Sequence, residues 1–318
     1  GQERNKDPQY IQQLQALQAK LQNLDRQRRE VLAQMQQLLG RSETLQELLQ
    51  QELGGWQERQ RRLCLGGPGD TNLRPLEAWF TELGQGLFQL RQLLRTLNDL
   101  RQKVTYERDP LVAETPLLEQ RLQEQLTHLL KSAFVVEQQP STPNAAKRPL
   151  VLRTASKFSA RARLLVRLHD RNHRMEAKIH IDRSPNLSPP APQGYPEPHL
   201  PSLGGILSPQ PLRGLGALGG LGRPGGLGTA SLTPVPSPQT TTLPFIIISN
   251  NNQFSSAWAS ILWFNMLSSD PKAQQFFSSP PPAPWPRLAE VLSWQFESVA
   301  ERGLSQDNLL MLAKKLLG

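Results

Sequence analysis

The sequence predicts an α+β multidomain chain: an elongated antiparallel helical coiled-coil bundle, a disrupted immunoglobulin-like β-sandwich and a small α-helical domain. Three observations predict this class. Apolar residues recur at helical spacing through most of 1–136, alternate at strand spacing between 149 and 182, and return to helical runs after 250. We therefore expect domains at 1–136, 137–250 and 251–318, with a low-complexity insertion at 184–243.

The first helix is predicted from a seam of residues that step alternately by four and three. Eleven of its fourteen positions are apolar, and the flanking positions are mostly Gln, Glu and Arg. This spacing is typical of one face of a coiled-coil helix, which other helices must cover. The seam consists of Tyr10, Leu14, Leu17, Leu21, Leu24, Arg28, Val31, Met35, Leu38, Ser42, Leu45, Leu49, Glu52 and Trp56.

Two further helices complete the predicted bundle. The loop Gly66–Asp70 ends the first helix, and apolar residues again step by fours and threes beyond it. Short polar loops between three such helices predict antiparallel packing. The expected core positions are Leu76, Phe80, Leu83, Leu87, Leu90, Leu94 and Leu97 in the second helix, and Leu117, Leu118, Leu122, Leu126, Leu129, Leu130 and Phe134 in the third.

After Val136 the apolar pattern changes to strict alternation. One face of the strand near 158–168 is apolar and the other is largely cationic, as expected of a strand packed on one side. With further strands near 149–152 and 174–182, the pattern predicts a small β-sandwich. The inward residues are Phe158, Ala160, Ala162, Leu164, Val166 and Leu168 in one strand, and Met175, Ala177, Ile179 and Ile181 in the next.

The segment 184–243 differs from the rest of the chain. It is dominated by Pro, Gly, Leu and Ser and has no periodic face, which predicts a flexible linker or insertion. Order is expected to return with a buried strand at 245–248. Helices are then predicted at 257–267, 286–300 and 306–317.

The positive charge is concentrated in one short window. The chain has a net charge of +9, and the window Lys147–Arg174 alone carries nine basic residues and one acid, Asp170. A confined positive charge of this kind favours a polyanionic partner. We expect the cationic strand face within the window to be the part that meets DNA.

Several classes of function lack sequence support. His169 and His173 are four residues apart but flank a predicted turn, and no Cys or carboxylate cluster completes a metal site. No nucleophile elbow or nucleotide fingerprint occurs. The lone Cys64 is consistent with a reducing compartment, either cytosol or nucleus, and no apolar run approaches the length of a membrane span.

Several runs of the chain resemble the STAT family, the signal transducers and activators of transcription. The resemblance as a whole covers residues 1–183 and 243–318, and the order of the runs along the chain matches the order of the family's domains. The runs are Phe134–Pro140, Arg148–Thr154, Ile248–Asn250, Ala257–Trp263, Leu292–Phe296 and Arg302–Ser305.

The resemblance implies a transcription factor of cytokine and interferon signalling that is found in cytoplasm and nucleus. It implies no enzymatic activity, cofactor, membrane or small-molecule substrate. The implied partners are DNA, another STAT protein in the full-length dimer, and an interferon regulatory factor held by the coiled coil. The family's first coiled-coil helix, its N-terminal and SH2 domains and its phosphotyrosine tail are not recognisable, so we expect a central fragment.

By the same resemblance, six residues fall where the family meets DNA. Arg and Lys would contact phosphates, and the Asn amide would read a base edge. The alternative for the Asn is a residue that ends a strand in a turn. The six are Arg148, Arg153, Thr154, Ala155, Lys157 and Asn250.

Two departures from the family bear on this site. Ala155 stands where many members have Gly, which predicts a stiffer loop close to DNA. The family's middle strands, between the equivalents of Asp182 and Leu243, are not recognisable, so the β domain is expected to be disrupted.

Three interpretations follow from these observations. The first is a sequence-specific DNA-binding transcription factor core. The second is a coiled-coil interaction scaffold that recruits an interferon regulatory factor and contributes little DNA recognition itself. Without the resemblance, the third would be a cytoskeletal coiled-coil protein, which the basic window and the Trp-rich C-terminal region argue against.

Overall fold

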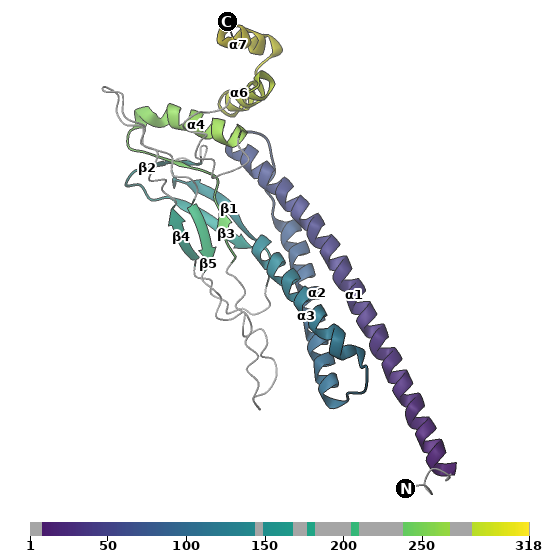
Figure 1. The fold of residues 1–318 in the computed structure, drawn as a ribbon. Helices are drawn as coiled ribbons and strands as arrows, with labels where there is room; N and C mark the ends of the chain where they lie inside the picture. The colour runs from purple at the N-terminus through teal and green to yellow at the C-terminus, as the bar shows by residue number, and fades with distance from the viewer. Residues whose placement is uncertain are drawn as a thin grey trace. The chain divides into compact units, whose positions relative to one another are not determined.

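A computed structural model describes residues 8–143, 149–167, 177–181, 205–209, 238–267 and 282–317, of which 177–181 and 205–209 are described by backbone alone. The chain divides into two compact units. The first contains residues 1–50 and 78–130, and the second contains 51–77 and 131–318. Figure 1 shows the elements of both units.

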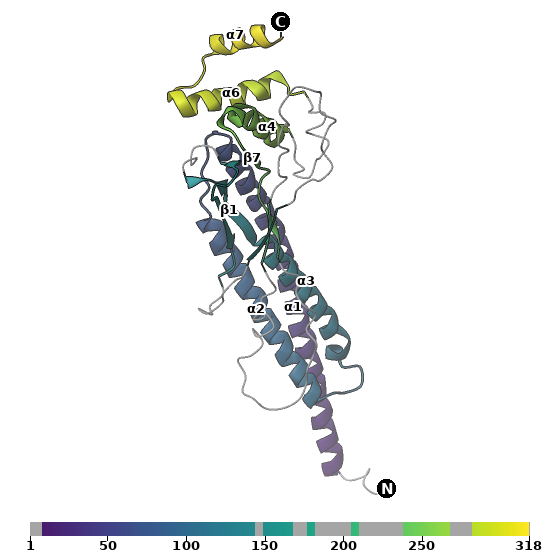
Figure 2. The same ribbon diagram turned by 90° about the vertical axis from the view of Figure 1, so that its left-hand side faces the viewer.

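The first unit is built from α1 (Pro8–Cys64), α2 (Arg74–Lys103) and α3 (Pro110–Ser132), of which α1 continues into the second unit. The three helices lie side by side in both ribbon views (Figures 1 and 2). Their facing sides bury Leu32, Met35, Leu39, Phe80, Leu87, Leu94, Leu118, Leu122 and Leu126. The three predicted helices are therefore confirmed, since each has the apolar stripe that a bundle needs.

The predicted seam of α1 is only half correct. Its positions 28, 35, 42, 49 and 56 are buried, but Val31, Leu38 and Leu45 are 39%, 44% and 51% exposed. The second buried row is Leu32, Leu39, Gln46, Leu53 and Gln60, one residue further along the helix. A shift of one residue moves this second row by about 100° around the helix axis, so neighbouring helices decide which row they cover. Tyr10, Leu14, Leu17 and Leu21 at the start of the seam, and Leu117 in α3, are also exposed.

Buried polar contacts fix the register between α1 and α3. The Gln46 Nε2 donates to the Gln125 carbonyl at 3.0 Å, and the Gln125 Nε2 donates to the Leu39 carbonyl at 2.9 Å. Arg121 forms a bidentate pair with Glu43, with both distances 2.7 Å, and its hydrogen bonds lower the pKa of the Glu43 carboxyl. The two glutamine bonds satisfy the side-chain nitrogens of Gln46 and Gln125, which burial would otherwise make costly.

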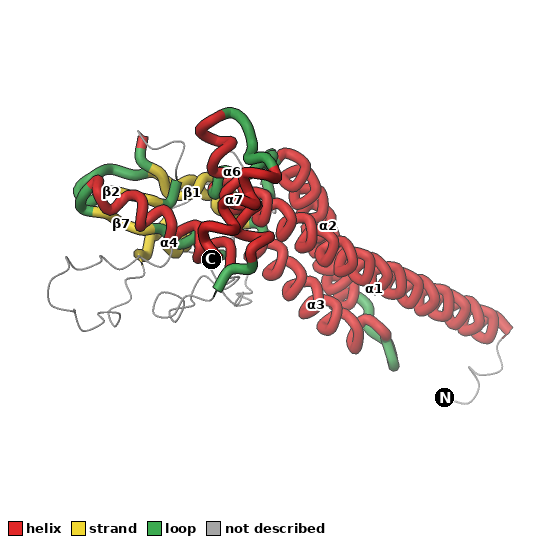
Figure 3. The backbone as a smooth tube through the Cα atoms, turned by 90° about the horizontal axis from the view of Figure 1, so that it is seen from above, coloured by secondary structure: helices red, strands yellow, loops and turns green. Residues whose placement is uncertain are grey.

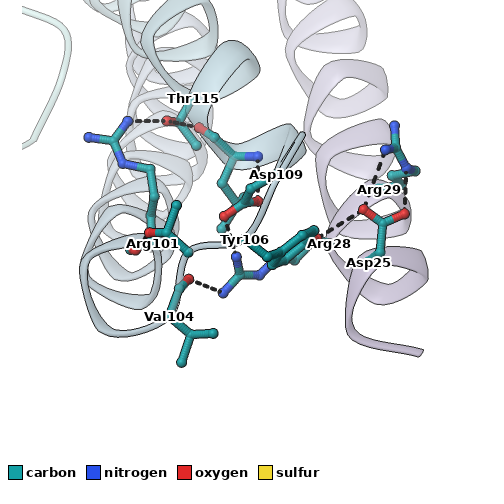
Figure 4. A network of polar contacts seen from close by, with 10 residues as sticks. Asp25, Arg28, Arg29, Arg101, Val104, Tyr106, Asp109 and Thr115 are labelled. Atoms are coloured by element: carbon teal, nitrogen blue, oxygen red, sulfur yellow. Dashed lines mark hydrogen bonds and ion pairs between the residues drawn. The ribbon is translucent and has the colours of Figure 1, made fainter. Parts of the chain in front are cut away.

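A second polar network lies where the loop between α2 and α3 meets α1 (Figure 4). The Arg28 guanidinium donates to Asp109 at 2.5 Å and to the Val104 carbonyl at 3.1 Å. Its carbon lies 5.4 Å from the centre of the Tyr106 ring, and the Tyr106 hydroxyl donates to Asp25 at 2.9 Å. The network joins the helix hairpin to one turn of α1.

The strands that the structure describes in the second unit form three small sheets. β1 (Phe134–Ser141) pairs antiparallel with β3 (Ser159–Leu164), and β2 (Val151–Arg153) pairs parallel with β7 (Ile246–Ile248). The third sheet has the order β4 (Ala177–Ile181), β5 (Gly205–Pro209) and β6 (Thr240–Thr241). β4 and β7 lie within the strands predicted near 174–182 and at 245–248.

The second unit also contains the helices predicted near the C-terminus. They are α4 (Phe254–Leu267), α6 (Trp285–Ala300) and α7 (Gln306–Leu317), and the short 3₁₀ helix η4 (Asn251–Gln253) precedes α4. α4 packs against β2 and β7 (Figure 3). Their shared core contains Leu150, Leu152, Phe245, Ile246, Ile248, Trp258 and Ile261.

Two predictions for the β region are wrong. Strict alternation of the strand near 158–168 predicts that Leu165, between the inward Leu164 and Val166, faces outward with the cations, but Leu165 is fully buried and its N–H donates to the Ala133 carbonyl at 2.8 Å. The alternation therefore ends at Leu164, because the chain turns inward there. The segment 184–243 is not irregular throughout, since β5 and β6 lie within it. Its remaining residues up to 237, like the predicted positions Leu168 and Met175, lie outside the described residues.

Cys64 ends α1 within the core that α4 shares with β2 and β7. Burial raises the pKa of its thiol to about 12, so the reactive thiolate is scarce at neutral pH. In the part of the chain that the structure describes, no helix is both long and apolar enough to cross a membrane.

Candidate nucleic-acid interface

The parallel pair of β2 and β7 brings the predicted DNA-facing residues to one edge. Arg153 is in register with Ile248, so the two strands end side by side. The loop 154–158 leaves β2 at this edge, and Asn250 follows β7 by two residues. Val151 and Leu152 anchor the strand in the core, which fixes where the loop begins. Five of the six predicted site residues therefore lie together, whereas Arg148 lies outside the described residues.

A tight turn shapes the start of the loop. The Thr154 N–H and hydroxyl both donate to the Ile248 carbonyl, at 2.9 and 3.3 Å. The Ser156 N–H donates to the Arg153 carbonyl at 3.2 Å, which closes a four-residue turn. Ala155 is the third residue of this turn and has a φ of 61°, in the left-handed region that favours Gly.

Replacing Ala155 with Gly is expected to stabilise the chain by roughly 0.5–1 kcal/mol, because Gly adopts positive φ without the Cβ clash. The matched control is Ala160→Gly in β3, where the extended backbone suits Ala. That change should cost roughly 0.5–1 kcal/mol. Urea titration followed by far-UV circular dichroism measures both, and destabilisation by Ala155→Gly equal to the control would contradict the assigned strain.

Two exposed cations of the loop border a hollow of about 480 Å³. Arg153 and Lys157 are exposed, and neither forms an ion pair with any carboxylate among the described residues. The rest of the lining is Thr142, Pro143, Val151, Ser156, Ile248 and Phe254. The lining of the hollow therefore combines apolar side chains with two cations and two hydroxyl-bearing side chains, a combination that suits an anionic group such as a phosphate.

The cationic face of β3 is less positive than its sequence indicates. Arg163 pairs with Glu137 at 3.2 Å, and Arg167, just beyond the strand, pairs with Glu77 at 2.7 Å. The hydrogen bond from Arg167 lowers the pKa of the Glu77 carboxyl. Arg161 is exposed and has no carboxylate partner among the described residues. Among the described residues of the basic window, the unpaired positive charge is therefore carried by Arg161 and by the loop cations, Arg153 and Lys157.

Asn250 has a structural role, because it caps the short helix η4. Its Oδ1 accepts from the Asn252 N–H at 3.1 Å, and the Gln253 Oε1 accepts from the Asn250 N–H at 3.2 Å, forming a capping box at η4. The alternative prediction of a turn residue is thus correct in geometry. The residue is exposed and its side-chain nitrogen donates to no described residue, which leaves that nitrogen for a ligand.

Sequence reasoning missed the hydroxyls of Thr142 and Ser156 as lining of this hollow. Ser156 lies between two basic residues of the site, Arg153 and Lys157. This position in the sequence could have identified Ser156 as part of the lining. Thr142 follows β1 and is distant in sequence, so only the folded chain brings it to the loop. No local pattern could have identified it.

Comparison with protein families gives three matches. Residues 1–126 match the model for the STAT transcription factor coiled-coil domain, and residues 138–197 match the model for the STAT protein DNA binding domain. Residues 270–318 match the model for the signal transducer and activator of transcription linker domain. The order of the three matches follows the order of the predicted domains.

Two curated proteins are similar over almost the whole chain. Signal transducer and activator of transcription 4 from Homo sapiens is 36% identical over 331 residues, which cover 96% of this chain and 44% of that protein. The Mus musculus protein of the same name is 35% identical over 329 residues, which cover 94% of this chain and 43% of that protein. The chain therefore spans less than half the length of these relatives.

Proposed function

The chain belongs to the STAT family of transcription factors, and from this premise we propose that it is the sequence-specific DNA-binding core of one. The observation that carries the proposal is the shared edge of β2 and β7. There Arg153 and Lys157 are exposed and unpaired with any described carboxylate, beside the exposed amide of Asn250. We also propose domains at 1–136, 137–250 and 251–318.

The chemistry of this edge suits docking on a duplex. Arg and Lys neutralise backbone phosphates and release counterions, which supplies salt-dependent affinity. The exposed amide nitrogen of Asn250 can donate to an acceptor on a base edge, while its oxygen keeps the η4 cap. Thr154 and Ala155 hold the loop in place through the turn. Arg148 is included from the family resemblance.

The test is the double variant Arg148→Glu with Arg153→Glu. If both arginines contact phosphates, DNA affinity falls and the slope of log affinity against log salt concentration decreases by about 1.8. Fluorescence anisotropy with a labelled duplex at several salt concentrations measures both quantities.

The control for this test has the same change in net charge at another place. Arg41→Glu with Arg59→Glu alters exposed residues of α1 and is expected to leave the slope unchanged. An unchanged slope in the Arg148 and Arg153 variant would remove these two residues from the interface.

Short runs favour a particular family member. Leu87–Leu94, Ser156–Phe158, Gln274–Phe277 and Ala283–Trp285 are similar to signal transducer and activator of transcription 2. On this basis we propose a role in interferon signalling, with passage between cytoplasm and nucleus. The proposed partners are another STAT protein in the full-length dimer and an interferon regulatory factor held by the coiled coil.

The second candidate function is an interaction scaffold that recruits a DNA-binding interferon regulatory factor. The exposed Val31, Leu38 and Leu45 on α1 favour it, since exposed apolar rows often mark protein interaction sites. Val31→Glu with Leu38→Glu should then abolish co-precipitation of the purified regulatory factor. Tight sequence-specific binding of DNA by the unmodified chain alone would count against the scaffold.

A further inference from the structure

We propose that Ser156 is a phosphorylation site for a serine kinase that selects basic substrates, and that its phosphate blocks the DNA-facing edge. The block of DNA binding rests on the proposed function, whereas the phosphorylation of Ser156 does not. The segment reads Arg153-Thr154-Ala155-Ser156-Lys157. Kinases distinguish substrates by charge patterns, and this class binds an arginine three residues before the acceptor in an acidic pocket.

The loop presents Ser156 rather than its neighbours. Residues 154–158 are all exposed and have no regular secondary structure beyond the turn. The Ser156 N–H is used in that turn, but its hydroxyl makes no hydrogen bond with any described residue. In contrast, the Thr154 hydroxyl donates to the Ile248 carbonyl, and Ser159 lies in β3 opposite Ser141 of β1.

A second serine, Ser305, also has an arginine three residues before it, but its hydroxyl is less available to a kinase. Arg302 precedes Ser305 by three residues, but the Ser305 Oγ accepts from the Asn308 N–H at 3.3 Å at the start of α7. Phosphorylation there would require this cap to open. The Ser156 hydroxyl makes no such bond with any described residue and lies in an exposed loop, so we expect it to accept phosphate faster.

The transfer is an ordinary phosphoryl exchange with ATP as the co-reactant. The Ser156 Oγ attacks the γ-phosphorus, and the bond from that phosphorus to the oxygen bridging it to the β-phosphate breaks. The serine proton passes to the catalytic base of the kinase. ADP leaves with the bridging oxygen, and the serine becomes a phosphate ester.

The phosphate on Ser156 would neutralise the positive charge that DNA binding needs. Ser156, Arg153 and Lys157 line the same hollow, so the phosphate is within the reach of both flexible cations. It brings a charge of about −1.5 to −2 and three strong acceptor oxygens, which can neutralise two cations. A DNA phosphate would then meet no free positive charge in the hollow.

The experiment incubates the full chain with ATP and the catalytic subunit of cyclic-AMP-dependent protein kinase. Peptide mass spectrometry is expected to find phosphate on Ser156 before Ser305. Ser156→Ala should lose this modification, and the matched Thr154→Ala should keep it. Absence of phosphate on Ser156 overturns the proposed site.

The second measurement compares DNA binding before and after modification. Loss of two phosphate contacts should weaken affinity roughly 10- to 100-fold near 0.1 M salt and lower the salt slope by about 1.8. Unchanged affinity of a phosphorylated chain overturns the blocking effect. If the unmodified chain fails to bind DNA, the proposed function and the blocking effect both fail, while incorporation still decides the site.

Discussion

Replacing Asp109 with alanine is expected to lower the free energy of unfolding by about 3–5 kcal/mol, because the change leaves the Arg28 charge buried without its partner. The side chains of Arg28 and Asp109 are only 8% and 0% exposed. Breaking such a pair from one side is costly, since the remaining cation cannot recover its hydration. Both residues belong to the helical unit, so the loss should fall on the bundle.

The same carboxylate has a second task that adds to this effect. Its Oδ1 accepts from the Leu111 N–H at 3.0 Å, which caps the first turn of α3 beside Pro110. The Arg28 contacts to Val104 and to the Tyr106 ring would remain in the variant, but they carry no negative charge. Asp109 is therefore the group on which this part of the network depends.

Urea titration followed by far-UV circular dichroism measures the effect. The matched control is Asp25→Ala, which removes a carboxylate of the same network that pairs with the exposed Arg29. Asp25 also accepts from the Tyr106 hydroxyl, but its side chain is 31% exposed and solvent can replace both contacts, so the control should lose much less stability than Asp109→Ala. Arg28→Met with Asp109→Leu, which removes both charges, should cost less than Asp109→Ala. Equal losses in Asp25→Ala and Asp109→Ala would refute the assigned importance of burial.

Trp56→Ala is expected to cost about 3–5 kcal/mol, since it empties the space of a large buried side chain. Trp56 is 1% exposed, and its indole N–H donates to the Thr71 carbonyl at 3.1 Å. The residue thereby holds the loop between α1 and α2 against the end of α1. Loss of the indole removes both the packing and this hydrogen bond.

Two variants separate these contributions. Trp56→Phe keeps most of the packing and loses the hydrogen bond, so it should cost less than Trp56→Ala. Trp79→Ala alters a tryptophan that is 46% exposed and should cost about 1 kcal/mol or less. Thermal and urea unfolding of the three variants provide the comparison, and a small effect of Trp56→Ala would show that the loop is held by other contacts.

Much of the fold was predictable because its signals are local. The helical spacing of Phe80, Leu87 and Leu94 in α2 requires only a neighbouring helix, and all three are buried. The α+β class and the coiled-coil, DNA-binding and linker parts agree with the three family matches. Periodic patterns of this kind predict which residues are buried, because burial of apolar surface dominates the stability of the folded chain.

The candidate site was predictable in part. Arg153 and Lys157 are visible as charges in the sequence, but their lack of carboxylate partners among the described residues is a property of the fold. Arg163 and Arg167 look equivalent to them in sequence, yet Glu137 and Glu77 pair with these two. Glu77 is distant along the chain, so no sequence pattern could have shown the pairing.

The sequence by itself determined the period of each segment, and hence that α1 is one long helix with apolar rows, that β2 is a strand and that β7 is a buried strand. Only the tertiary structure decided which row of α1 is buried. Gln46 is covered and Leu45 is 51% exposed. The reason is that the Gln46 amide finds the Gln125 carbonyl across the interface, which offsets the cost of burying a polar group. Neighbouring rows of one helix compete for the same partners, and the partners' positions decide between them.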